Sequence, residues 1–312
     1  MSSRLTPLAG LSVVGASGFI GSAVARAAHK RAHWAVREIA RSASPAAFDV
    51  RDADAVYAAL SGTAVVVHAA SYIGNDPDLC YEINVRGTEN IAKAFLGSNG
   101  ERLMYVSTAA VYGRGPFHMA SERATSVRPS SALSKSRARA EQIVLDAGGV
   151  VVRPHLVLGV GDKWVGPGVI RYARTLGGFP RSSGDARHSV VEVSHLGNAI
   201  VDLLEAPDAV NCSVNVAQTT LSLTELVTLF AGVIDSVPAH AIGSTAPTSA
   251  QKDARLAHAA SLLEVEHTFS TARIQALVDS PSLSAPFRLS RPERQWYREH
   301  DLEHSTVGPV VV

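Results

Sequence analysis

Short apolar runs alternate with longer mixed segments through the first half of the chain. The runs are rich in valine and bounded by turn residues, which is typical of strands buried on both faces. They predict strands at Leu11–Val14, Ala35–Ile39, Ala64–His68, Arg102–Ser107 and Val150–Val152. Helices are predicted between them, at Gly21–Arg31, Ala53–Leu60, Tyr81–Leu96 and Ser134–Asp146. Strands joined by crossover helices predict an α/β fold with a doubly wound parallel (Rossmann) sheet.

A glycine-rich turn follows the first predicted strand. Val13-Val14 runs into Gly15-Ala16-Ser17-Gly18-Phe19-Ile20-Gly21, where a predicted helix begins. A dinucleotide pyrophosphate needs such exposed backbone N–H groups, a helix N-terminus with partial positive charge, and no obstructing side chains. The expected cofactor-binding residues here are Gly15, Ser17, Gly18, Phe19, Ile20 and Gly21, with Gly21 letting the helix pack closely on the strand. Asp49 and Val50 follow where the adenine would be bound.

The end of the second predicted strand favours NADP(H) over NAD(H). NAD-binding proteins of this fold place an acidic residue there, whereas this chain has Ala40 followed by Arg41 and Ser42. A guanidinium and a hydroxyl suit the 2′-phosphate of NADP. The alternatives are that Arg41 is an ordinary solvated arginine, or that Glu38 binds the ribose. Strand alternation points Glu38 away if Ile39 faces inward.

Several further motifs occur in a consistent order over residues 9–235. They are Val67-His68-Ala69-Ala70, Asn84-Val85-Arg86-Gly87-Thr88, Met104–Gly113 with Ser107-Thr108-Ala109-Ala110-Val111-Tyr112-Gly113, Ser134-Lys135-Ser136, and Val152-Arg153-Pro154. Together they resemble the extended short-chain dehydrogenase/reductase family, which includes nucleotide-sugar epimerases and dehydratases. The resemblance implies further cofactor contacts from Ala69, Ala70, Pro154 and His155.

The resemblance also divides the chain. It implies a dinucleotide-binding domain over residues 9–160, to which residues 190–220 return, and a smaller, mostly helical substrate-covering lobe over residues 161–189 and 221–312. Beyond Gly159 the pattern predicts a helix at Val169–Thr175, a strand at Ser213–Val216 and a helix at Leu223–Ile234. The last eighty or so residues carry no motif that we can interpret.

The family's active-site tyrosine is missing. The family pattern Tyr-x-x-x-Lys corresponds here to Ser131-Ala132-Leu133-Ser134-Lys135, and no tyrosine occurs between Tyr112 and Tyr172. The resemblance implies that Thr108 orients the carbonyl and that Lys135 holds the nicotinamide ribose. Ser131, at the tyrosine's place, is too short and too weak an acid to replace a phenol. Because oxidising a sugar alcohol requires a base, the substitution argues against epimerisation and less strongly against ketone reduction.

The composition limits the kinds of partner and the cellular location that we expect. The formal net charge of +1 gives no case for binding nucleic acid or an anionic membrane. Cys80 and Cys212 are the only cysteines, which favours a reduced, cytoplasmic protein. An uncharged N-terminal run resembles a signal peptide, but its glycines and Pro7 make a poor apolar core. No pair of histidines or carboxylates has metal-ligand spacing, and we expect a monomer or homodimer.

Three functions remain open. The first is an NADPH-dependent ketoreductase that resembles the tyrosine-lacking reductases of aromatic polyketide antibiotic biosynthesis, with the substrate assisting protonation. The second is a non-catalytic NADP-sensing or scaffolding protein, and the third is a nucleotide-sugar epimerase or dehydratase with a relocated base. The side chains expected near a planar aromatic ketone are Tyr72, Tyr112, Phe117, Met119 and Trp164, with His118 and His188 as possible proton donors.

Overall fold

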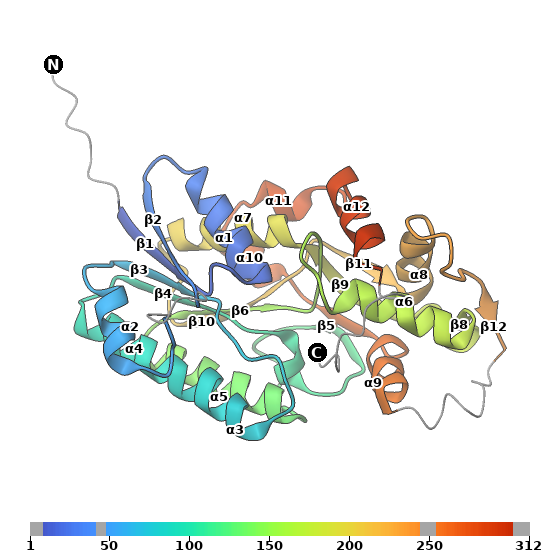
Figure 1. The fold of residues 1–312 in the computed structure, drawn as a ribbon, viewed down its shortest axis with the longest axis horizontal. Coiled ribbons are helices and arrows are strands. Elements are labelled where there is room, and N and C mark those ends of the chain that lie inside the picture. The colour runs from blue at the N-terminus through green and yellow to red at the C-terminus, as the bar shows by residue number, and fades with distance from the viewer. Residues whose placement is uncertain (1–8, 42–47, 244–253, 302–312) are drawn as a thin grey trace, which may run out of the picture.

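The main sheet has six parallel strands in the order β10-β6-β4-β3-β1-β2 (Figure 1). The computed structural model describes residues 9–41, 48–243 and 254–301. The strands of this sheet are β1 (Ala9–Val14), β2 (Trp34–Ile39), β3 (Val65–His68), β4 (Arg102–Val106), β6 (Val150–Pro154) and β10 (Cys212–Val216). This arrangement confirms the doubly wound parallel sheet, and β10 lies at its edge beside β6.

Helices cover both faces of this sheet because successive strand side chains point to opposite sides. Val65 and Val67 pack in one apolar cluster with α1 (Phe19–His29) and α7 (Val193–Glu205). Val66 packs in the opposite cluster, with α2 (Ala53–Leu60), α4 (Gly87–Gly97) and α5 (Ala132–Asp146). Figure 1 shows these two helical layers on either side of the strands.

The second part of the molecule contains a sheet that the sequence pattern did not reveal. Its strands run β11-β9-β13-β5, and β7 also pairs with β9. They are β5 (Phe117–Ala120), β7 (Leu156–Leu158), β9 (Arg187–Glu192), β11 (Thr219–Ser222) and β13 (His267–Phe269). The prediction of a mostly helical lobe was therefore incomplete, and β5 and β7 join this second sheet although they lie within residues 9–160. These strands are short, and their pairing partners are distant in sequence.

The helices of this part pack around a separate apolar cluster. They are α6 (Val165–Leu176), α8 (Leu223–Ala231), α9 (Ala254–Leu263) and α12 (Arg291–Glu299), with α10 (Ala272–Leu277) and α11 (Pro281–Ser284) beside the main sheet's helices. A small pairing joins β8 (Phe179–Pro180) to β12 (Ala241–Ile242).

The predicted helix at Tyr81–Leu96 is not uniform. It consists of a short α3 (Pro77–Leu79), a π-helical segment at Cys80–Arg86, and α4. Single π-helical turns inside helices often accompany functional sites. None of the helices in the described ranges is long and apolar enough to cross a membrane.

Candidate active site

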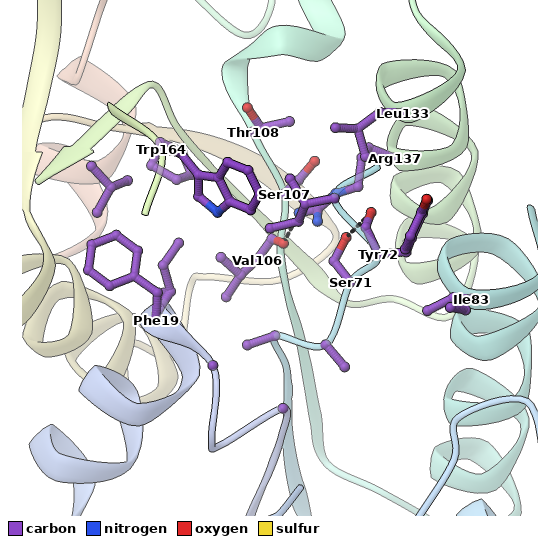
Figure 2. Close-up of a pocket in the computed structure, with 18 of the residues that line it drawn as sticks. Phe19, Ser71, Tyr72, Ile83, Val106, Ser107, Thr108, Leu133, Arg137 and Trp164 are labelled. Carbon is purple, nitrogen blue, oxygen red and sulfur yellow. Dashed lines mark hydrogen bonds between the residues drawn. The ribbon is translucent and has the colours of Figure 1, made fainter. Parts of the chain in front are cut away.

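A cavity of about 500 Å³ opens at the carboxyl ends of β1, β3, β4 and β6. This is the edge at which open parallel sheets bind their ligands. Its walls are the glycine turn, the loop after β3, the end of β4, one side of α5, and the segment leading into α6. Figure 2 shows Phe19 and Trp164 on one side of this cavity, facing Leu133 and Arg137 of α5.

The glycine turn is built for close backbone approach. Gly15 has φ +87°, and a Cβ there would lie 2.6 Å from the Ala70 amide nitrogen. A Cβ on Gly21 would lie 2.1 Å from the Gly15 carbonyl oxygen, so Gly21 lets α1 pack against the turn from behind the cavity. Ser17, Gly18, Phe19 and Ile20 line the cavity, with Gly18 at the N-cap of α1. The N-terminus of α1 at this turn fits the pyrophosphate of a dinucleotide.

At the end of β2, Arg41 is exposed and lines the same cavity. Ser42 lies outside the described residues. Glu38 does not line the cavity, and its carboxylate lies 2.9 Å from the His29 imidazole. Asp49 and Val50 line the cavity beside Arg41, as do Ala69, Ala70, Pro154 and His155. A hydrogen-bonded Arg51 guanidinium lowers the pKa of the Asp49 carboxyl.

On α5, the structure corrects the placement of Ser131 and Lys135. Neither lines the cavity, and Lys135 is exposed. Ser131 is the N-cap of α5: its Oγ accepts from the Ser134 backbone N–H at 3.0 Å, and Ser134 Oγ accepts from the Ser131 backbone N–H at 3.0 Å. Ser131 therefore has a helix-capping role, of the kind that contributes about 0.5–2 kcal/mol to stability.

The residues of α5 that do face the cavity are Leu133, Ser134 and Arg137. Leu133 and Arg137 are four residues apart and share a helix face, as a Tyr-x-x-x-Lys pair would. A shift of two residues turns the helix by about 200°, so Ser131 and Lys135 satisfy the same spacing on the wrong side. In the cavity, leucine and arginine thus stand where the family pattern has tyrosine and lysine. Sequence reasoning missed Arg137.

Arg137 is buried, with 8% of its surface exposed. Its guanidinium donates to the Val106 carbonyl oxygen and lies over the Tyr105 ring, 4.9 Å from the ring centre. Its Nε has no hydrogen-bond partner, and no carboxylate in the described ranges forms an ion pair with it. The Arg137 charge helps to lower the pKa of the His68 imidazole, after burial as the main cause. A buried cation of this kind is suited to an anionic or electron-rich ligand atom.

The end of β4 supplies hydroxyl groups. Thr108 lines the cavity, and its Oγ1 accepts from the Ala110 backbone N–H at 3.1 Å, which leaves its O–H free to donate. Ser107 Oγ also borders the cavity and is buried without a hydrogen-bond partner among the described residues. Thr108 and Ser107 thus place two hydroxyl groups in the cavity wall.

Asn84 fixes the loop after β3. Its Oδ1 accepts from the Tyr72 backbone N–H at 2.8 Å and from Ser71 Oγ at 3.0 Å. Its Nδ2 donates to Ser136 Oγ on α5 at 3.0 Å. This side chain thus ties two walls of the cavity together. The Asn84–Thr88 motif was the available signal, although we had not assigned it a role.

Among the expected substrate contacts, only Tyr72 and Trp164 line the cavity. The other five do not line it: four lie in the segment after β4, and His188 lies in β9 of the second sheet. Tyr112 is buried and is hydrogen-bonded to Asn215 and Arg153. Phe117 packs on Tyr112 and Phe269. His118 is exposed and pairs with Glu266, Met119 is exposed, and His188 is buried.

The C-terminal region holds Trp164 in place. Asp162 also lines the cavity, and its carboxylate accepts from the backbone N–H groups of Trp164, Val165 and Gly166 at 2.7–2.8 Å. Tyr297 of α12 donates its hydroxyl to Asp162 at 2.9 Å. Thus α12, where no sequence motif was recognised, supports one wall of the site.

Residues 11–223 of the chain match the family described as the NAD dependent epimerase/dehydratase family. Over 183 residues the chain is 30% identical to a 4-hydroxy-2-methyl-3-oxo-4-farnesyl-3,4-dihydroquinoline-1-oxide ketoreductase of Stigmatella aurantiaca, covering 52% of this chain and 54% of that protein. It is 27% identical to UDP-glucose 4-epimerase of Vibrio cholerae, covering 64% and 67%. Matches to the curated relatives thus span between about a quarter and two thirds of those proteins.

Solved structures share the fold. A short-chain dehydrogenase/reductase superfamily protein of Agrobacterium tumefaciens with bound NAD superposes with a TM-score of 0.73 at 16% identity, covering 93% of this chain and 98% of that one. RMD from Pseudomonas aeruginosa complexed with NADPH gives a TM-score of 0.66 at 21% identity, covering 93% and 95%. Structural neighbours therefore bind either cofactor, and the fold alone does not distinguish NAD from NADPH.

Proposed function

Because the chain belongs to the NAD dependent epimerase/dehydratase family, we propose that it is an NADPH-dependent ketoreductase acting on a planar polycyclic aromatic ketone of the polyketide, angucyclinone-like type. One observation carries the proposal: the cavity-facing side of α5 presents Leu133 and Arg137 where the family pattern has tyrosine and lysine. The cavity keeps a dinucleotide cradle and hydrogen-bond donors but lacks that phenol.

The missing phenol favours reduction over oxidation. Oxidising an alcohol requires a base to take its proton, and the leucine side chain of Leu133 cannot act as one. Reducing a ketone requires a donor to the oxygen on which charge develops, with the proton coming from water or substrate. When bound, NADPH would supply the hydride to the carbonyl carbon. The carbonyl oxygen gains the proton, so the product is the alcohol.

The donors available in the cavity support this role. The O–H of Thr108 is free to donate a hydrogen bond. Ser107 Oγ and Arg137 Nε are buried without a hydrogen-bond partner among the described residues. The N–H groups of the Arg137 guanidinium can stabilise negative charge on the carbonyl oxygen. We assign Thr108 to orient the carbonyl and Arg137 to hold the cofactor ribose or the developing oxyanion.

Arg41 supports NADPH as the cofactor. It lines the cavity at the end of β2, where the fold would place the 2′-phosphate, while Glu38 bonds to His29 instead. Apolar and aromatic walls from Phe19, Tyr72 and Trp164 support a flat, apolar substrate. A phenol next to the substrate carbonyl would stabilise the alkoxide as a catalytic tyrosine does.

A nucleotide-sugar epimerase is the second candidate, because the similarity to UDP-glucose 4-epimerase covers more of the chain than the similarity to the ketoreductase. In that case a relocated base is needed, and the phenol of Tyr72 in the cavity wall is the group to consider. A non-catalytic NADP-binding role predicts cofactor binding without turnover of either substrate class.

The deciding experiment incubates the purified protein with NADPH and polycyclic ketones that carry a phenol beside the carbonyl. A parallel reaction contains UDP-glucose with NAD+ or NADP+, because epimerisation begins by oxidising the sugar alcohol. We expect loss of absorbance at 340 nm and a product heavier by two hydrogens. The matching methyl ether should bind but react at least about 10²-fold more slowly, as when one oxyanion donor is lost. Interconversion of UDP-sugars without reduction of any ketone would refute the proposal. Equal turnover of the methyl ether would show that the protein and not the substrate phenol assists protonation. Thr108 would then be the first residue to replace.

A further inference from the structure

Three histidines form a cluster at the wall of the cavity, and the proposed ketone reduction assigns no chemical step to any of them. His155 follows β6 in the cavity wall, His188 lies in β9, and His267 lies in β13. One ring nitrogen of each lies within 4.8 Å of a ring nitrogen of the other two. The cluster therefore lies where the main sheet's cavity meets the second sheet, and the three segments are far apart in sequence.

We propose that His155, His188 and His267 form a binding site for one divalent transition-metal ion of the zinc type. Neutral imidazole nitrogen is among the commonest zinc ligands, and three histidines with an open fourth position make a complete protein ligand set. Three imidazoles bound at 2.0–2.1 Å would place their ring centres roughly 5 Å apart. The observed ring centres are separated by 5.3 Å for His155 and His267, and by 6.0 Å for the other two pairs. The ring centres would have to approach by up to about 1 Å for the three nitrogens to share one ion.

The hydrogen bonds of two rings select the nitrogens that can bind a metal. His188 Nε2 lies 3.0 Å from the Leu263 carbonyl oxygen, and His267 Nδ1 lies 2.7 Å from that of Val265. A carbonyl oxygen only accepts, so His188 Nε2 carries the hydrogen and the lone pair of that ring is on Nδ1. The His267 ring also faces the backbone carbonyl of Leu262, so a metal ion would have to take the place of one of its two carbonyl partners. Metal-binding histidines are usually oriented by such bonds to backbone carbonyls.

Two nitrogens of the cluster lack any partner. His155 Nε2 and His188 Nδ1 are buried without a hydrogen bond among the described residues. Metal ions bind imidazole through such a nitrogen lone pair. Because His155 lines the cavity, an ion can reach the cluster from solvent through it.

The competing interpretation is that three neutral rings simply pack together. Their planes are inclined by only 18–24°, and the ring centres lie within the range of aromatic contact. In that case the protein would bind no metal at this place. The unpartnered nitrogens of His155 and His188 favour the metal site. Ring packing alone would leave the free-energy cost of burying these polar atoms without a hydrogen bond uncompensated.

The test titrates the EDTA-treated, full-length protein with Zn²⁺ by calorimetry and with Co²⁺ by visible absorption. We expect one equivalent of each, tetrahedral-type Co²⁺ bands, and a rise in melting temperature on adding Zn²⁺. His155→Gln and His267→Gln should each weaken Zn²⁺ binding by more than about 100-fold, the upper end for losing an outer partner of a ligand. His118→Gln is the matched control, because His118 lies on neighbouring β5 but its side chain is 69% exposed.

Circular dichroism establishes that each variant is folded. Folded wild-type protein that takes up no stoichiometric Zn²⁺ overturns the proposal, as does binding that survives both cluster substitutions. Binding lost only in His118→Gln also overturns it, because the ion would then occupy the His118–Glu266 pair. The readouts are independent of turnover, so they remain informative if the proposed ketoreductase activity fails.

Discussion

Replacing Arg137 by methionine tests which face of α5 serves the site. The substitution keeps an unbranched stem but removes a buried charged donor that lines the cavity. If the guanidinium hydrogen-bonds the bound cofactor, its loss costs about 1.5–3 kcal/mol, the range for hydrogen bonds to charged groups. That cost corresponds to a roughly 10- to 150-fold higher Kd for NADPH.

The same substitution also affects folding. Arg137 donates to the Val106 carbonyl oxygen, and leaving a buried acceptor unsatisfied costs about 1–3 kcal/mol. Removing a buried cation that has no ion-pair partner in the described ranges offsets part of this cost. Arg137→Met should therefore stay folded with a lowered melting temperature, and Arg137→Lys should recover part of the NADPH affinity by restoring the charge.

The assay is titration with NADPH, followed by energy transfer from tryptophan, since Trp164 lines the same cavity. Lys135→Met and Arg139→Met are the controls, because both side chains are exposed on the same helix. We expect both controls to bind NADPH within about twofold of wild type, as is usual for surface substitutions. An unchanged Kd for Arg137→Met, or an equal loss in Lys135→Met, would refute the assignment of the functional face.

Three further predictions concern other parts of the molecule. Arg41→Ala should raise the Kd of NADPH roughly 10- to 150-fold while leaving that of NADH unchanged; equal affinities for both cofactors in the wild type would contradict this. Gly21→Ala should lower stability by about 1–3 kcal/mol and weaken NADPH binding, because its Cβ would lie 2.1 Å from the Gly15 carbonyl oxygen. Gly168→Ala is the control, because a Cβ at Gly168 in α6 would meet nothing within 4 Å. It should raise the free energy of unfolding by about 0.5–1 kcal/mol, and urea titration measures both variants. Burial lowers the pKa of His68 to about 3 from an ordinary 6.5, so the unfolded chain binds the extra proton first as pH falls. Stability should decline from pH 6.5 downward, and His68→Gln should reduce that slope by up to about 1.4 kcal/mol per pH unit in urea unfolding, whereas an unchanged slope would show that His68 titrates normally.

The sequence by itself determined the dinucleotide-binding half. Its strands are short valine-rich runs, and the glycine turn at Gly15, Gly18 and Gly21 acts over a few consecutive residues. Such local signals depend on the backbone conformation and on the periodicity of apolar residues, and both are properties of one continuous segment of the chain. The order of the motifs then predicted at which edge of the sheet the ligand-binding cavity lies.

Tertiary structure alone decided which residues face the cavity. Ser131 with Lys135 and Leu133 with Arg137 both satisfy a four-residue spacing, and only the packing of α5 on the sheet selects the second pair. The second sheet and the support of Trp164 by Tyr297 depend on pairings between distant segments. The spacing of His155, His188 and His267 matches no metal-binding motif, because the three residues meet only when the two sheets come together. Contacts of this kind are set by global packing, which periodicity along the chain does not encode.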